Sequence, residues 1–340
     1  MIDLKGMTLQ ELEEFFSEIG EKKFRAKQVF EWIYKGATSF DEMTNLSKDL
    51  REKLGRVAYI SNLQIDVVQH SIKDGTRKYL FVLPDGNMIE SVFMKYKYGN
   101  SICVSSQAGC RMGCRFCAST IGGLRRNLTP GEIIDQLICA ERETGEKIGH
   151  IVVMGTGEPF DNYENLSKFI QIANKKEGLN IGMRNITVST CGVVPMIEKF
   201  AEDFPQVNLA ISLHAPNDSI RSSMMPINNR YKIDELIRAC KSYIAKTNRR
   251  ITFEYTLVSG KNDSSKDIDQ LIGLVRGINC HVNLIPLNKV SENELTASNR
   301  QVAETISKRL TDAGVTATVR RELGADIDAA CGQLRLGKKA

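Results

Sequence analysis

Three cysteines stand close together in a pattern suited to holding a metal cluster. Cys110, Cys114 and Cys117 have the spacing C-x3-C-x2-C. A purely structural zinc or iron–sulfur site usually takes four protein ligands. Three thiolates on a four-iron cluster leave one iron open for a small molecule. The spacing therefore favours a reactive cluster over a structural one.

Two plainer interpretations remain open, namely buried free thiols and a zinc site completed from elsewhere. Gly109 and Gly113 argue against free thiols, because glycines suit a loop that wraps closely around a ligand. The chain has nine cysteines, so counting does not exclude a fourth ligand. Four further cysteines fall in helix or strand patterns, and we expect them to be core or bystander thiols: Cys139, Cys191, Cys240 and Cys280.

The bulk composition is that of a globular protein with ample core. The chain has 340 residues, of which 42% are hydrophobic and 26% charged, and a formal net charge of +5 that mildly favours an anionic partner such as RNA. No apolar run approaches the ~20 residues that cross a bilayer, and no secretory signal is visible. Nine cysteines without a small disulfide-rich frame suit a reducing compartment. We expect a cytoplasmic protein without membrane contact, and a monomer.

The first part of the chain is predicted to be helical and to end in a β-hairpin. Thr8 and Glu11 form a capping-box pattern ahead of an amphipathic run, and further helices are expected over 25–35 and 47–54. Strand patterns over 76–83 and 87–96 flank Asp85-Gly86, a strong hairpin signal. We predict an accessory domain over residues 1–95.

From residue 96 to 340 the pattern changes to strands alternating with helices. Six such units predict an α/β fold in which a parallel sheet curls into a partial barrel, a (β/α)6 arrangement. Chemistry in such barrels collects at the carboxyl ends of the strands, and the cysteine loop follows the first strand. The predicted strands are 101–105, 150–154, 185–189, 208–213, 250–257 and 281–286, with a further short one over 318–321. The predicted helices include 129–144, 163–175, 232–245 and 298–313.

Polar residues and glycines follow the other strands at equivalent positions. Gly157 and Glu158 come after the second strand, where glycines allow close backbone approach and a carboxylate can accept bonds from an ammonium. Each alone is typical of an ordinary turn or loop. Together the set indicates contacts to the ribose, carboxylate and adenine of a nucleoside cofactor: Ser189, Ser212, Leu213, His214 and Asn288.

Two lone cysteines complete the reactive set. Cys103 lies on the first strand, seven residues before Cys110. Cys331 stands near the end of the chain between small residues and is followed by Gly332, which is compatible with an accessible thiol. A packed terminal cysteine is the plainer alternative. Nothing in the sequence by itself places Cys103 and Cys331 in one cavity.

Several of these motifs resemble one family over nearly the whole chain. The cysteine spacing is similar to the radical S-adenosylmethionine signature. The segments 103–107, 154–159, 212–216 and 326–334 together resemble the RlmN family, RNA adenine carbon-2 radical methyltransferases. The helix over 24–32 is similar to the N-terminal domain of that family.

The resemblance implies a mechanism and roles for the residues. Cys110, Cys114 and Cys117 would hold a [4Fe-4S] cluster whose open iron binds S-adenosylmethionine, and the segment 155–159 would hold its amino group. Two S-adenosylmethionine molecules would serve each turnover. One methylates Cys331, and the other is cleaved to a 5′-deoxyadenosyl radical that takes a hydrogen from the methylated cysteine.

The same resemblance implies how the product is released. The thiomethylene radical adds to the adenine ring, and Cys103 resolves the protein–RNA adduct by forming a transient disulfide with Cys331. Glu90 matches a family carboxylate placed near the target base. Without the resemblance, a solvated strand residue is an equally good interpretation of Glu90.

The implied partners are 23S ribosomal RNA, transfer RNA and an electron donor such as flavodoxin or ferredoxin. Basic residues that would suit RNA phosphates, or a plain solvated face, are Lys22, Lys23, Arg25, Lys27, Arg125 and Arg126. One alternative is the sister branch, which methylates carbon-8 of the same adenine and confers antibiotic resistance; Pro159 favours carbon-2. The other is a non-catalytic iron–sulfur RNA-binding protein whose cluster takes a fourth cysteine.

Overall fold

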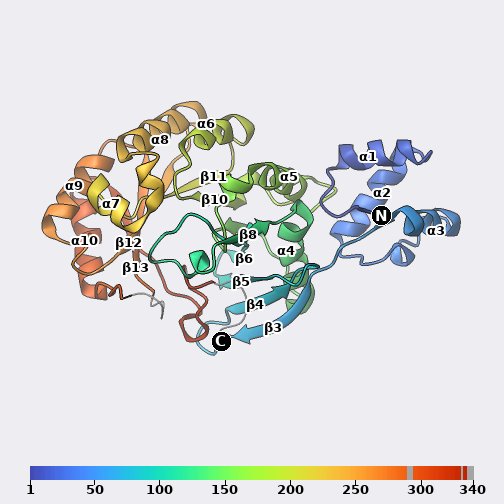
Figure 1. Cartoon of the computed structure of the whole chain (residues 1–340), viewed down its shortest axis with the longest axis horizontal. Coiled ribbons are helices and arrows are strands. Elements are labelled where there is room, and N and C mark those ends of the chain that lie inside the picture. Colours follow the sequence, from blue (N-terminus) through green and yellow to red (C-terminus); the bar gives the residue numbers. More distant parts are fainter. Residues whose placement is uncertain (289–293, 331, 335–340) are drawn as a thin grey trace.

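The protein is built on one large sheet flanked by helices (Figure 1). The computed structural model describes residues 1–288, 294–330 and 332–334. The sheet has ten strands in the order β14-β13-β12-β11-β10-β9-β6-β5-β4-β3. Cys331 lies outside the described residues, but the structure describes the residues on either side of it, Ala330 and Gly332.

Seven consecutive strands of this sheet run parallel, which confirms the predicted radical S-adenosylmethionine type of α/β fold. The strand expected over 318–321 is present two residues earlier. The parallel strands are β6 (Gly99–Cys103), β9 (His150–Val153), β10 (Ile186–Thr190), β11 (Asn208–Ser212), β12 (Ile251–Leu257), β13 (Cys280–Pro286) and β14 (Thr316–Val319).

The predicted hairpin extends this sheet instead of standing apart from it. Strand β5 (Met88–Tyr96) pairs antiparallel with both β4 (Arg77–Val82) and β6, and Gly86 takes the positive φ that the turn requires. The boundary expected at residue 95 therefore falls within a continuous sheet. A further strand, β3 (Gln64–His70), was not predicted, because it is an edge strand whose side chains are mostly exposed and carry no clear alternation.

The N-terminal helices form a small unit beside α4 (Figure 1). They are α1 (Leu9–Glu18), α2 (Lys23–Tyr34) and α3 (Lys48–Val57), and the capping box of Thr8 and Glu11 is present. Lys5 and Asp135 form a fully buried ion pair of 2.6 Å between this unit and α4, which holds the two together.

The remaining helices pack against the outside of the curled sheet. They are α4 (Pro130–Thr144), α5 (Tyr163–Asn174), α6 (Val194–Asp203), α7 (Asp218–Met224), α8 (Ile233–Thr247), α9 (Ser265–Val275) and α10 (Arg300–Asp312). Among the described residues, no helix is long and apolar enough to cross a membrane. The helices leave the carboxyl ends of the parallel strands free to form the site.

Candidate active site

The cluster loop, residues 107–127, is shaped by a short pair of antiparallel strands, β7 (Gln107–Gly109) and β8 (Leu124–Asn127). Gly109 has φ +78°, and a Cβ there would lie 2.0 Å from the carbonyl oxygen of Gly123. The same carbonyl accepts a 3.2 Å hydrogen bond from the Cys110 amide. Gly109 thus permits close approach of the loop to its own backbone, which places Cys110.

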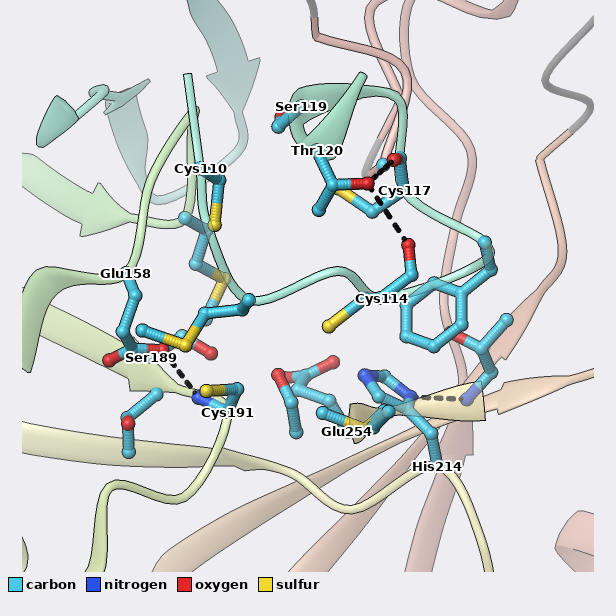
Figure 2. Close-up of a pocket in the computed structure, with 18 of the residues that line it drawn as sticks. Cys110, Cys114, Cys117, Ser119, Thr120, Glu158, Ser189, Cys191, His214 and Glu254 are labelled. Carbon is cyan, nitrogen blue, oxygen red and sulfur yellow. Dashed lines mark hydrogen bonds between the residues drawn. The ribbon is translucent and has the colours of Figure 1, made fainter. Parts of the chain in front are cut away.

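All three predicted cluster cysteines line one cavity, which has an empty volume of about 930 Å³ including space open to solvent. Figure 2 shows Cys110 and Cys114 on the side of the cavity that faces Glu158 and Cys191. Burial raises the pKa of Cys110 to about 12, and burial also raises the pKa of Cys114; repulsion from neighbouring acidic groups adds to both shifts. The buried thiols of Cys110 and Cys114, beside the half-buried Cys117, are costly to ionise alone and suit a site in which bound iron supplies positive charge.

This donor set fits a [4Fe-4S] cluster. Cys110, Cys114 and Cys117 would hold it, and the cluster would supply one electron to a bound S-adenosylmethionine. Thr120 steadies the loop, because its hydroxyl donates to the carbonyl oxygens of Cys114 and Cys117 over 3.3 and 2.9 Å (Figure 2).

Gly157 and Glu158 form the facing wall. Gly157 has φ +112°, and a Cβ there would come within 2.6 Å of the Gln107 side chain, so only glycine fits. Glu158 is buried, and its carboxylate accepts from the amides of Cys191 (2.7 Å) and Phe160 (3.0 Å). Burial raises the pKa of Glu158, while these bonds lower it. Its visible role is to join the ends of two strands, because it follows β9 and accepts from Thr190 and Cys191 at the end of β10.

His214 enters the cavity as a neutral donor. Its Nδ1 accepts a 2.9 Å hydrogen bond from the Thr256 amide, and burial, with Arg221 nearby, lowers its pKa to about 3. In a neutral imidazole whose Nδ1 accepts, the proton sits on Nε2. His214 also has φ +53°, a rare backbone conformation for this residue type, and its ring meets Phe116 edge to face.

The other predicted cofactor contacts divide into two groups. Ser189, Ser212 and Asn288 line the cavity as expected. Leu213 does not line it: its side chain is fully buried in the core, its amide donates to Glu254, and its carbonyl accepts from Arg221. A contact between Leu213 and the cofactor therefore stays a prediction, because Leu213 is not among the residues that line the cavity.

Three residues of the site were missed at the sequence level. Cys191, expected to be a bystander, lines the cavity, and its thiol contacts Glu158. Glu254 also lines it and is 6% exposed. Arg221 is fully buried and donates to the carbonyls of Cys191 (2.6 Å), Ser212 (3.1 Å) and Leu213 (3.2 Å). Arg221 lies in the short helix α7, and nothing in the sequence indicates that its side chain is buried.

A second cavity adjoins the first and contains Cys103. It has an empty volume of about 570 Å³. Ala330 lines this second cavity, whereas Gly332 lines the first cavity. The two residues next to Cys331 in the sequence therefore line different cavities. Four residues line both cavities: Met154, Ile285, Asn288 and Arg320.

Glu90 is not a solvated strand residue. It is 7% exposed and forms an ion pair of 3.3 Å with Lys78. Glu90 and Val92 are two positions apart on β5, so their side chains lie on the same face of the sheet, and Val92 pairs with Cys103 in the neighbouring strand. The structure therefore brings Glu90 to the side of the sheet that holds the second cavity.

Two of the predicted phosphate contacts are engaged within the protein. Arg126 makes a two-pronged ion pair of 2.8 Å contacts with Glu132 and also contacts Asp85 in the hairpin turn. Lys27 pairs with Glu177 over 3.2 Å. Arg125 is exposed, as are Lys22 and Lys23.

Comparison with known proteins identifies the family. Residues 2–60 match the ribosomal RNA large subunit methyltransferase N-terminal domain, and residues 104–272 match the radical SAM superfamily. Proteins named as probable dual-specificity RNA methyltransferases RlmN from Caldanaerobacter subterraneus and Clostridium perfringens are each 55% identical, over 98% of this chain and 98% and 97% of theirs. The chain belongs to the RlmN family of radical S-adenosylmethionine RNA methyltransferases.

A solved structure agrees with this assignment. A radical SAM methyltransferase from Sphaerobacter thermophilus is 45% identical and superposes with a TM-score of 0.94, covering 98% of this chain and 99% of that one. Membership implies a [4Fe-4S] cluster and S-adenosylmethionine as cofactors of an enzyme that acts on RNA. The site residues fit both, as the cavity shows.

Proposed function

We propose that this enzyme methylates carbon-2 of an adenine in 23S ribosomal RNA and in transfer RNA. Cys331 would carry the methyl group and Cys103 would release the product. The observation that supports this most directly is the pair of joined cavities, with Cys103 in one, the cluster cysteines in the other, and residues next to Cys331 lining each.

The first step needs a thiol that can be methylated. The Cys331 sulfur donates an electron pair to the methyl carbon of one S-adenosylmethionine, the sulfonium C–S bond breaks, and S-adenosylhomocysteine leaves while the thiol proton passes to solvent. A second S-adenosylmethionine is used in the same turnover. A methylatable thiol and a second S-adenosylmethionine in the same turnover both fit a C-terminal segment whose residues line the two cavities.

The second cavity would receive the target base. Its wall is apolar at Val92, Met94 and Leu323, which suits a nucleobase face, and Arg320 and Arg321 lie where an anionic backbone would enter. Glu90 lies on the same face of the sheet and would contact the base. In the closed-shell protein–RNA adduct, the Cys103 thiolate would attack the sulfur of Cys331 and form an S–S bond. The S–CH2 bond would break with its electron pair passing to the methylene carbon, which would take up a proton to become the methyl group of the released RNA.

The finer partner assignments follow from this reaction. An external one-electron donor such as flavodoxin or ferredoxin is needed for the cluster. The proposed substrates are cytoplasmic RNAs, so the enzyme would act there, and as a monomer because one chain supplies both cavities.

The test is identification of the product nucleoside. The enzyme is reconstituted without oxygen and supplied with reductant, S-adenosylmethionine and a 23S RNA fragment that spans the peptidyl-transferase centre, and the digested RNA is analysed by mass spectrometry. We expect 2-methyladenosine. Formation of 8-methyladenosine would place the enzyme in the sister branch, and absence of both together with absence of 5′-deoxyadenosine would support the non-catalytic alternative.

A further inference from the structure

The C-terminal segment, defined as residues 324–330 and 332–334, is attached to the rest of the protein at both ends. Its first half contacts the turn between β3 and β4, residues 71–76, which is about 250 positions away in the sequence. Its second half contacts the cluster loop. Cys331 stands in sequence between these two attachments.

The contacts with the turn are formed by two carboxylates, one from each partner. Asp326 accepts from the Ser71 hydroxyl over 2.7 Å and from the Ile72 amide over 3.0 Å. Asp74 accepts from the Gly324 amide over 2.9 Å and from the Thr76 amide over 3.0 Å. These bonds lower the pKa of both carboxyl groups, so both are ionised at neutral pH.

Packing at this contact leaves little freedom of position. Gly324 has φ +63°, and a Cβ there would lie 2.7 Å from the Ala329 side chain and 2.9 Å from that of Thr76. Lys78 then links the segment to Glu90, because its ammonium donates to the Asp328 carbonyl over 3.3 Å and pairs with the Glu90 carboxylate.

The second attachment involves the cluster loop itself. The Ala118 amide donates to the Gly332 carbonyl over 2.7 Å, and the Ser119 hydroxyl donates to the Leu334 carbonyl over 2.8 Å. Ala118 follows Cys117 directly. The segment therefore spans the distance from the hairpin to the cluster loop.

We propose that the turn between β3 and β4 is a docking clasp for the C-terminal segment, with Asp326 and Asp74 as positioning residues for Cys331. This inference rests on the proposed role of Cys331 as methyl carrier. The clasp acts by holding the segment at the junction of the two cavities, so that the carrier residue meets both S-adenosylmethionine and the base. It also gives β3, at the far edge of the sheet, a part in the reaction.

The experiment compares Asp326→Ala, Asp326→Asn and Ser71→Ala with the wild-type holoenzyme. The control is Asp312→Ala, at an exposed carboxylate ending α10. We expect Asp326→Ala to speed amide hydrogen exchange in residues 324–334 about tenfold, because it removes two bonds to one carboxylate, without changing exchange in β10 or β11. Asp326→Asn keeps one accepting oxygen and should restore part of the protection.

The same variants separate positioning from simple loss of fold. In Asp326→Ala we expect 5′-deoxyadenosine still to form, because the three cluster cysteines are unchanged, and methylated RNA to fall about tenfold. Wild-type exchange together with wild-type RNA methylation in Asp326→Ala would overturn the clasp. If the wild-type enzyme methylates no RNA, the proposed function fails, and the exchange measurement, which needs no substrate, still decides whether the clasp exists.

Discussion

The cluster loop and the C-terminal segment meet at the same cavity, but the protein holds them in different ways. The loop contains buried thiols and the antiparallel strands β7 and β8, and it depends on Gly109, which no other residue could replace. The segment is held by hydrogen bonds to two separate partners and by the packing of Gly324, Ala329 and Leu334, and Asp326 is exposed. The difference would suit the tasks proposed for them, because a bound cluster must stay in place whereas the proposed carrier residue must serve two sites.

The strongest test of the fixed region is Cys110→Ala. Removing one of three thiolates leaves too few ligands for the cluster, so we expect loss of the iron–sulfur absorbance and of all methylation. The folded state should survive, because Cys110 faces the cavity. Circular dichroism of the variant checks the fold, and an active variant with an intact cluster would show that another residue can serve as the third ligand.

Cys103→Ala tests the second cavity, which Cys103 lines together with residues of the C-terminal segment. Methyl transfer to the base should proceed, but release should fail, so the enzyme accumulates as a covalent adduct with RNA. Denaturing gel electrophoresis would show this as a shifted band that ribonuclease removes. Normal turnover without any adduct would exclude Cys103 from product release.

Arg221→Lys should loosen the cavity wall formed by β10 and β11. Lysine keeps the charge but loses the planar fork that bonds three carbonyls, leaving buried acceptors unpaired. We expect the free energy of unfolding to fall by about 2–4 kcal/mol. Urea unfolding measures this loss, and the surface variant Arg238→Lys on α8, whose side chain is exposed, provides the matched control. Equal stability of the two variants would contradict the role assigned to Arg221.

The effect expected to be smallest at neutral pH comes from His214, whose contribution to stability depends on pH. Its folded pKa, about 3, lies below the unfolded value of 6.5, so the unfolded chain binds more protons between these values. Stability from this residue is complete above pH 6.5 and declines as the pH falls towards 3, by up to ~1.4 kcal/mol per pH unit. Unfolding of His214→Gln should show a shallower decline than wild type, and identical slopes would mean that His214 is not buried in neutral form.

The predictability of the fold differs between the barrel strands and the edge strand β3. The barrel strands alternate with helices and carry strong apolar runs, so their order and approximate ends follow from local pattern. Strand β3 does not, because an exposed edge strand has little alternation to detect. It joins the barrel through successive antiparallel pairs, β3 with β4, β4 with β5 and β5 with β6.

The candidate site divides in the same way. Cys110, Glu158 and His214 follow strands at equivalent ends, which the topology must bring together. Arg221 and Cys191 could not be assigned, because their inward orientation depends on how α7 and the end of β10 pack. The contact between Asp326 and Ser71 joins residues 255 positions apart, and no local pattern reveals it.

The most direct test of the account follows the methyl group to Cys331. The reconstituted enzyme is incubated with S-adenosylmethionine bearing a deuterated methyl group, with and without RNA, and the peptide that contains Cys331 is analysed by mass spectrometry. The account predicts a deuterated methyl group on Cys331 before RNA is added and its loss to RNA afterwards. Methylated RNA from an enzyme whose Cys331 never carries the label, or from Cys331→Ala, would contradict it.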